Sequence, residues 1–213
     1  MKTVKSDMSE VLLNVENIAI SFGGLVAISD LSFNVHKGEI VSLIGPNGAG
    51  KTTAFNIITG FLKPNSGSIT YRDKSLTGLA AHQVAKYGVV RTFQKTSVFD
   101  GNTVIENIMM GLHLNGRCKV WEVLLGLPRV SIENTRLEER ALEILDLVGL
   151  SNRASDMASD LAYGELRLLE VAIALAAEPA LLLLDEPASG MNPSETASFM
   201  KTVSKIRDEG TTI

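Results

Sequence analysis

The sequence predicts an α/β fold that carries a mostly helical insertion at about residues 95–165. Short apolar runs separated by turn residues fill the first seventy positions, as expected for strands. From about residue 103 to 175 the apolar residues instead recur at helical spacing. A continuous apolar run at 181–184 then fits a strand that is buried on both faces. Together these three observations predict an α/β core with a mostly helical insertion.

Each predicted element follows from its local pattern. Gly23-Gly24, Lys37-Gly38 and Asn65-Ser66-Gly67 separate the four early strands, which we expect at Leu12–Ile20, Leu31–Val35, Ile40–Ile44 and Ser68–Arg72. The helical spacing is clearest at Leu137, Ala141, Ile144, Leu145 and Val148. Gly149 should end that helix. The last strand is predicted at Leu181–Leu184, and a final helix runs from about Ser194 to Glu209 until Gly210.

Composition limits the class of protein. The chain has 213 residues, 45% of them hydrophobic, so it can build a substantial core. A net charge of −4 does not suggest a nucleic-acid partner. Cys118 is the single cysteine, which fits a reducing compartment. The N-terminus lacks a secretory pattern, and the apolar runs are too short to span a bilayer, so a membrane role would require a partner.

A glycine-rich loop follows the apolar run at Ile40–Ile44 and matches the pattern GxxxxGK[ST] between a strand and a helix. Glycines let successive N–H groups turn toward a phosphate. Lys51 can reach the β- and γ-phosphates of a nucleoside triphosphate, and the Thr52 hydroxyl can bind Mg²⁺. A helix at about Thr53–Thr59 would direct its positive end at the anion. The predicted phosphate-binding residues are Gly45, Pro46, Asn47, Gly48, Ala49, Gly50, Lys51, Thr52 and Thr53.

Two adjacent carboxylates, Asp185 and Glu186, follow the last apolar strand. Apolar strands that end in acids are common, so this signal is weak by itself. About 130 residues after a phosphate-binding loop, it indicates catalysis. We expect Asp185 on the metal side and Glu186 as the base that deprotonates the attacking water.

The segment Leu161-Ala162-Tyr163-Gly164-Glu165, followed by a helix at about 166–176, resembles the signature motif of ATP-binding subunits of ABC transporters. The resemblance covers essentially the whole chain. It implies an ABC-type P-loop NTPase fold with an antiparallel β subdomain. It implies that Phe22 stacks on adenine, although a core phenylalanine is the alternative, and that Gln94 contacts Mg²⁺ and the attacking water. The loop at 189–193 would cross a dimer interface.

The chain looks like the ATPase subunit of branched-chain amino acid importers in four segments taken together: 44–53 with Phe55-Asn56, 89–94, 161–164 and 190–193. The resemblance implies ATP and Mg²⁺ as cofactors. It further implies a homo- or heterodimer with a second ATP-binding subunit, transmembrane permease subunits, an indirect link to a substrate-binding protein, and a peripheral place on the cytoplasmic face of the inner membrane. Ala162 stands where a serine would offer a hydroxyl to the γ-phosphate. A soluble ABC-type ATPase of DNA repair or translation is a further alternative, but those usually carry two cassettes or long coiled coils.

The segment Gly210–Ile213 resembles the start of a family strand that runs on to a histidine at the γ-phosphate. We therefore expect a single domain over 1–213 that lacks this C-terminal part, hydrolyses ATP poorly and folds marginally. His36, His82 and His113 are far from that motif position. The alternative function is a truncated nucleotide-binding module that binds ATP without turnover.

Overall fold

The computed structural model describes residues 10–92, 98–113 and 128–213. These residues form two compact units. The sheet unit comprises the described residues of Met1–Arg91, Ala180–Asp185 and Arg207–Ile213, and the helical unit comprises those of Thr92–Pro179 and Glu186–Ile206. Each unit contains its own part of the predicted site.

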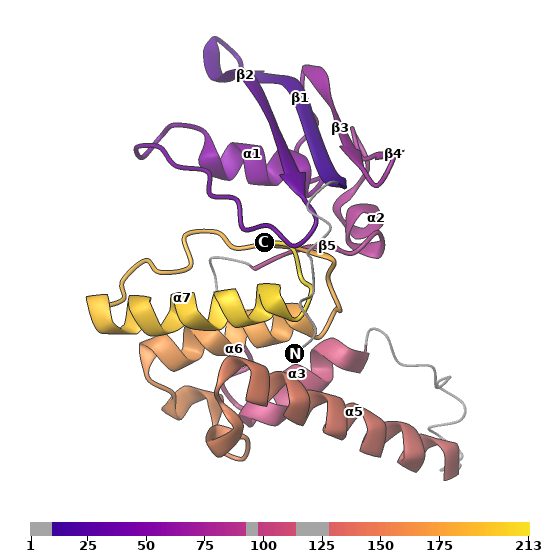
Figure 1. The fold of residues 1–213 in the computed structure, drawn as a ribbon, viewed down its shortest axis with the longest axis vertical. Helices are drawn as coiled ribbons and strands as arrows, with labels where there is room; N and C mark the ends of the chain where they lie inside the picture. The colour runs from indigo at the N-terminus through magenta and orange to yellow at the C-terminus, as the bar shows by residue number, and fades with distance from the viewer. Residues whose placement is uncertain (1–9, 93–97, 114–127) are drawn as a thin grey trace, which may run out of the picture. The chain divides into compact units, whose positions relative to one another are not determined.

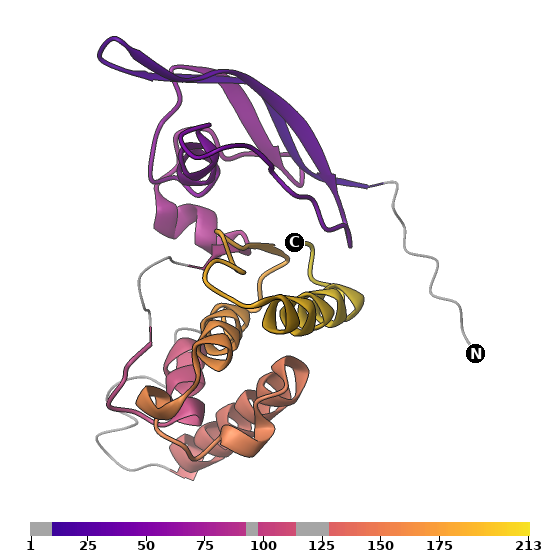
Figure 2. The same cartoon turned by 90° about the vertical axis from the view of Figure 1, so that its left-hand side faces the viewer.

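A four-stranded antiparallel sheet dominates the sheet unit, with strands in the order β2-β1-β3-β4. The strands are β1 (Val11–Phe22), β2 (Leu25–His36), β3 (Ser66–Tyr71) and β4 (Lys74–Ser75). Buried and exposed residues alternate along much of β1, as expected for a strand with one face on the core. Figures 1 and 2 show this sheet curving over helix α1 (Lys51–Ile58). The sheet is the predicted antiparallel β part of the fold.

A second, parallel pair of strands lies in the same unit. Helix α2 (Ala81–Lys86) leads into β5 (Val89–Arg91), which pairs with β6 (Leu181–Leu183). One apolar core joins the sheet, both helices and this pair. Its buried members are Leu12, Leu13, Val15, Ile18, Ile20, Val35, Ile57, Ile58, Ile69, Tyr71, Leu76, Val84, Val89, Leu181 and Leu183.

The prediction of a strand at Ile40–Ile44 is wrong, because residues 39–46 have no strand structure. The backbone there pairs only at its start: Ile213 donates to the carbonyl of Glu39 at 2.9 Å and accepts from the amide of Val41 at 2.9 Å. Among the described residues this ladder goes no further, and Ile44 is 90% exposed. An apolar run predicts that a segment can be buried, but a strand also needs a neighbouring backbone along its length.

The residue before Ile213 pairs on the other side. The Thr212 amide donates to the Ala180 carbonyl at 3.1 Å, and the Leu182 amide donates to the Thr212 carbonyl at 2.8 Å. The Thr212 hydroxyl also accepts from the Gly38 amide at 2.9 Å. Two consecutive residues therefore join the segment before the glycine-rich loop to strand β6.

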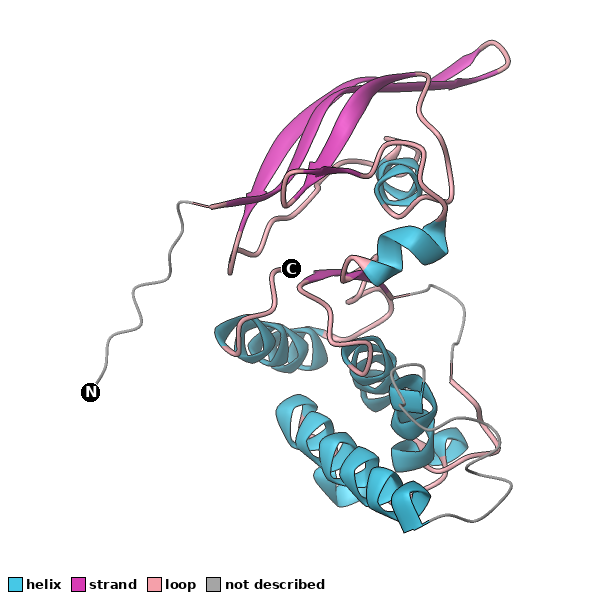
Figure 3. Ribbon diagram, turned by 90° about the vertical axis from the view of Figure 1, so that its right-hand side faces the viewer, coloured by secondary structure: helices cyan, strands magenta, loops and turns pink. Residues whose placement is uncertain are grey.

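The helical unit is built from α3 (Val104–His113), α5 (Pro128–Val148), α6 (Tyr163–Leu175) and most of α7 (Pro193–Asp208). Two short 3₁₀ turns, η1 (Ser151–Arg153) and η2 (Ala158–Asp160), connect α5 to α6. Figure 3 shows these helices in cyan, and Figures 1 and 2 show α6 and α7 side by side. This region confirms the predicted change from strands to helices.

The helical spacing predicted on α5 is confirmed by burial. All five apolar positions have at most 7% exposure: Leu137, Ala141, Ile144, Leu145 and Val148. Gly149 follows with φ of +80° and ends the helix. Of the helices that the structure describes, none is long and apolar enough to cross a membrane.

Candidate nucleotide site

The glycine-rich loop has the backbone geometry of a phosphate cradle. Gly48 and Gly50 both have φ of +83°, and Gly50 is the residue before helix α1. A Cβ atom on Gly50 would lie 2.8 Å from the Ala27 carbonyl oxygen, so only glycine fits there. Gly45 does not have a positive φ. Its contribution is space, since a Cβ would lie 3.1 Å from the Ala49 Cβ.

The N-terminus of α1 is prepared for an anion. The helix begins at Lys51, two residues earlier than predicted, without a side-chain cap and without an acidic residue in its first turn. Its first N–H groups and the positive end of its dipole therefore have no competing carboxylate on that turn. The Lys51 Nζ donates to the carbonyls of Gly45 at 2.8 Å and Pro46 at 2.9 Å, which keeps the ammonium at the loop.

The carboxylate of Asp185 is held in a buried ion pair. The Arg91 Nη2 lies 2.5 Å from Asp185 Oδ2, and the two side chains are 8% and 5% exposed. The Arg91 Nη1 donates to Asn56 Oδ1 at 2.6 Å. Sequence patterns did not identify Arg91 as a site residue. The available signal was a cation that ends the apolar run Val89-Val90.

Hard oxygen donors suited to Mg²⁺ are present in the sheet unit, on Thr52 and Asp185. No group of three or more His, Cys, Asp or Glu side chains in the described ranges could hold a metal by itself. Mg²⁺ bound with a nucleotide usually takes one or two protein ligands, with phosphates and waters completing its shell. The residues present therefore fit a metal that arrives with a triphosphate.

Phe22 ends strand β1 and is 48% exposed. Such exposure argues against the alternative that it is a core residue. The Asn65 Oδ1 accepts from the amide of neighbouring Ser21 at 2.7 Å and fixes the strand end. The ring therefore has a surface on which a base can stack.

In the helical unit, Ala162 is the residue that precedes α6. Its amide donates to Glu165 Oε2 at 3.0 Å, while Glu165 Oε1 accepts from Arg153 Nε at 3.1 Å. A capping box has two bonds, and alanine has no hydroxyl to make the first of them. Only the bond from the Ala162 amide to the Glu165 carboxylate is present. The motif Leu161–Glu165 is thus a helix start held by a carboxylate.

Tyr163 links this motif to the loop after Glu186. Its hydroxyl donates to the Ser189 carbonyl at 2.8 Å and accepts from Arg167 Nη2 at 2.8 Å. Gly190 has φ of +81°, and a Cβ there would come within 3.1 Å of the tyrosine oxygen. The glycine therefore permits the close contact. Sequence patterns gave no signal for it.

Glu186 is exposed and has φ of +47°, a left-handed conformation that is costly for a side-chain-bearing residue. Such strain is concentrated at functional sites, where the surrounding structure maintains it. Gln94 lies outside the described residues.

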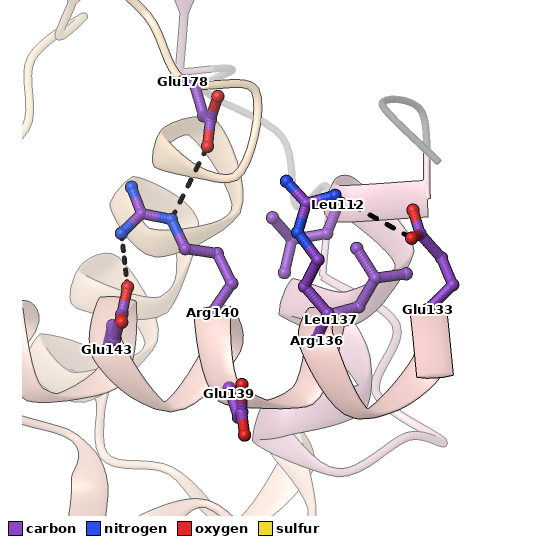
Figure 4. A pocket seen from close by; sticks show the side chains of 8 residues that line it. All are labelled: Leu112, Glu133, Arg136, Leu137, Glu139, Arg140, Glu143 and Glu178. Atoms are coloured by element: carbon purple, nitrogen blue, oxygen red, sulfur yellow. Dashed lines mark hydrogen bonds and ion pairs between the residues drawn. The ribbon is translucent and has the colours of Figure 1, made fainter. Parts of the chain in front are cut away.

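The helical unit also has a cavity of about 310 Å³. Figure 4 shows its lining residues: Leu112, Glu133, Arg136, Leu137, Glu139, Arg140, Glu143 and Glu178. The arginines pair with lining glutamates, with Arg140 at 2.6 Å from Glu143 and 3.6 Å from Glu178. None of the predicted nucleotide-binding residues lines it, so it is not the nucleotide site.

Comparisons with known proteins agree with this assembly of motifs. The ABC transporter family model matches residues 28–189. The high-affinity branched-chain amino acid transport ATP-binding protein LivG of Salmonella typhimurium is 43% identical over 96% of this chain and 80% of that protein. BraF of Pseudomonas aeruginosa, named for the same transport, is 39% identical over 95% and 79%.

Solved structures give the same result. MJ1267, an ATP-binding cassette of an ABC transporter, superposes with a TM-score of 0.82 at 32% identity, over 96% of this chain and 80% of that one. Its ADP conformation superposes with a TM-score of 0.80 at 30% identity, over 94% and 78%. The fold, the phosphate cradle and these relatives agree. The chain belongs to the ABC transporter family, as an ATP-binding subunit with ATPase activity.

Proposed function

We propose that this chain is the ATPase subunit of an importer of branched-chain amino acids. The observation that carries the proposal is the match, over nearly the whole chain, to proteins named for that transport. The cradle at α1 supplies the matching chemistry, because it offers backbone N–H groups and the Lys51 ammonium to a triphosphate. The amino acid itself would be bound by partner subunits.

In the proposed reaction, a water oxygen attacks the γ-phosphorus of ATP, and the bond from that phosphorus to the β–γ bridging oxygen breaks. Glu186 accepts the water proton, and Gln94 orients the water. Lys51 and the loop amides at Gly48–Lys51 neutralise charge that develops on the phosphate oxygens. When bound, Mg²⁺ supplies Lewis-acid stabilisation of the phosphates. Thr52 and Asp185 would hold it.

The partners proposed are a second ATP-binding subunit, identical or related, and transmembrane permease subunits, with an indirect link to a substrate-binding protein. ATP would lie between Lys51 of one subunit and the Leu161–Glu165 motif of the other. In this arrangement the chain would lie on the cytoplasmic face of the inner membrane. The net charge of −4 supports a partner set without nucleic acid. The single-domain organisation with a helical subdomain at about 95–165 remains a prediction.

The catalytic role is tested with Glu186→Gln. An enzyme should keep its ATP affinity and lose turnover by about 100-fold or more, since the general base is removed. Glu178→Gln is a matched control, because Glu178 is also exposed and also has a positive φ, of 50°. Equal turnover in wild type and Glu186→Gln would instead support a binding module.

The substrate is tested by reconstituting the chain with its permease and binding-protein partners in vesicles. ATP-dependent uptake of labelled leucine that unlabelled isoleucine and valine inhibit, and that lysine does not, is the expected result. Uptake restricted to a polar or charged amino acid would overturn the substrate assignment while leaving the ATPase assignment intact.

A further inference from the structure

We infer that Arg91 is a positioning residue that holds the Asp185 carboxylate toward the face of α1 that carries Thr52, and thereby sets how strongly Mg²⁺ promotes ATP binding. The inference rests on the proposed function, because it assumes that Mg²⁺ binds with the nucleotide between Thr52 and Asp185.

The first support is the fork geometry of the guanidinium. One nitrogen of Arg91 lies 2.5 Å from Asp185 Oδ2, and another lies 2.6 Å from Asn56 Oδ1. A planar guanidinium with two such bonds fixes the direction of both partners, whereas a single ammonium would not. Arg91 therefore connects the end of β5, the end of β6 and helix α1 within the sheet unit.

The second support is the position of Asn56 on α1. Residues four apart lie on the same helix face, so Asn56 is one turn below Thr52 and Phe55 is one turn below Lys51. The Arg91 Cζ lies 5.5 Å from the centre of the Phe55 ring. Arg91 thus contacts the helix one turn below both the predicted phosphate ligand and the predicted metal ligand.

The third support is burial. The Arg91 and Asp185 side chains are 8% and 5% exposed, so water screens their interaction little. The Arg91 Nε is buried and has no hydrogen-bond partner among the described residues, which is a cost that the other contacts must offset. A purely structural role is served as well by apolar side chains, since buried ion pairs contribute little net stability. Orienting a ligand is a role that apolar side chains cannot take.

The test measures ATP affinity of the full chain by titration with a fluorescent ATP analogue, once in excess Mg²⁺ and once in EDTA. Arg91→Met should leave the affinity in EDTA within about threefold of wild type, because the phosphate cradle is unchanged. It should reduce the Mg²⁺-dependent gain by about 10- to 100-fold, the usual effect of losing a partner of a metal ligand.

Arg91→Lys should recover part of the gain, because it restores the charge without the fork. Asn56→Ala should lower the gain by a few fold, since it frees one arm of Arg91. Arg140→Met is the matched control, because Arg140 is an ion-paired arginine outside the nucleotide motifs. Circular dichroism melts establish that each variant folds.

The outcomes separate the two proposals. Wild type without any Mg²⁺-dependent gain contradicts the proposed function itself. If a folded Arg91→Met keeps the wild-type gain in ATP affinity from Mg²⁺, only the inference is overturned. Equal losses in Mg²⁺ and in EDTA show that Arg91 supports α1 rather than Asp185, and also overturn it. If Arg91→Met fails to fold, the comparison of Arg91→Lys and Asn56→Ala with wild type decides, and an unchanged gain in both overturns the inference.

Discussion

The phenolic oxygen of Tyr163 lies 2.8 Å from the carbonyl oxygen of Ser189, to which it donates a hydrogen bond. The bond joins the signature motif to the loop that follows Glu186, across 26 positions of sequence. In the proposed dimer, the Leu161–Glu165 motif faces the ATP bound by the partner subunit, and the loop at 189–193 crosses the interface. A direct bond between them makes their positions interdependent.

Tyr163→Phe should therefore lower both stability and turnover. Phenylalanine loses both the bond to the Ser189 carbonyl and the bond from Arg167, which together should cost about 1–2 kcal/mol of unfolding free energy. Turnover should fall roughly two- to tenfold, short of the ~100-fold that a 1 Å misplacement can cost. Urea unfolding and steady-state ATPase assays check these values. Tyr87→Phe, at a residue of similar exposure in the sheet unit, is the control, and equal effects of the two variants would contradict the prediction.

The strained backbone at Glu186 predicts a difference between two variants that both lack the carboxylate. Glycine relieves a left-handed strain of about 1–2 kcal/mol but loses about 0.5–1 kcal/mol of chain entropy. Glu186→Gly should thus be more stable than Glu186→Ala by about 0.5–1 kcal/mol in urea unfolding. Lys201 lies inside α7, where alanine is the better helix former, so Lys201→Ala should be more stable than Lys201→Gly by about 1 kcal/mol. The same order at both positions would disprove strain at Glu186.

Glu106 predicts a pH dependence of stability. Its carboxylate accepts from the Thr103 amide at 2.8 Å at the start of α3, and this backbone hydrogen bond, with the Thr103 side chain, lowers the pKa of Glu106 below its ordinary 4.5. A lowered folded-state pKa contributes stability above pH 4.5, which is lost as pH falls through the folded-state pKa. Wild type should exceed Glu106→Gln in stability at pH 7, and the difference should shrink below pH 4.5.

Urea unfolding at a series of pH values measures this difference. Glu138→Gln, at an exposed position within α5, serves as the control for removing a carboxylate from a helix surface. A Glu106 difference that persists unchanged at low pH would mean that the side chain acts by packing rather than by charge.

Sequence patterns predicted the features that depend on residues close together in the chain, namely the glycine-rich loop and the buried face of α5. The glycine-rich loop was found because its chemistry requires fixed residue types at fixed spacing, and the turns at Gly48 and Gly50 agree with that expectation. The spacing on α5 matched its buried face because a helix converts sequence periodicity directly into a face. Side chains that act within one turn of one element can be read from sequence.

Contacts between distant segments could not be read in the same way. The apolar run at 40–44 was taken for a strand, but hydrogen-bond partners come from elsewhere in the chain. The bond from Tyr163 to Ser189, and the ion pair of Arg91 with Asp185, join residues 26 and 94 positions apart. No periodicity encodes such pairs. A charge at the end of an apolar strand is the nearest local hint, and it does not identify the partner.

The hydrogen bonds that Thr212 and Ile213 make with the Gly38–Val41 segment have a consequence for biosynthesis. The Thr212 hydroxyl bonds the Gly38 amide 174 positions earlier, just before the phosphate-binding loop. Ribosomes add about 5–20 residues per second, so Gly38 waits roughly 10–35 seconds for this partner to be made. During translation the segment that leads into the loop has neither Thr212 nor Ile213 beside it. A nascent chain therefore makes the bonds between the Gly38–Val41 segment and residues 212–213 only after the β1–β2 hairpin and the described helices have been synthesised.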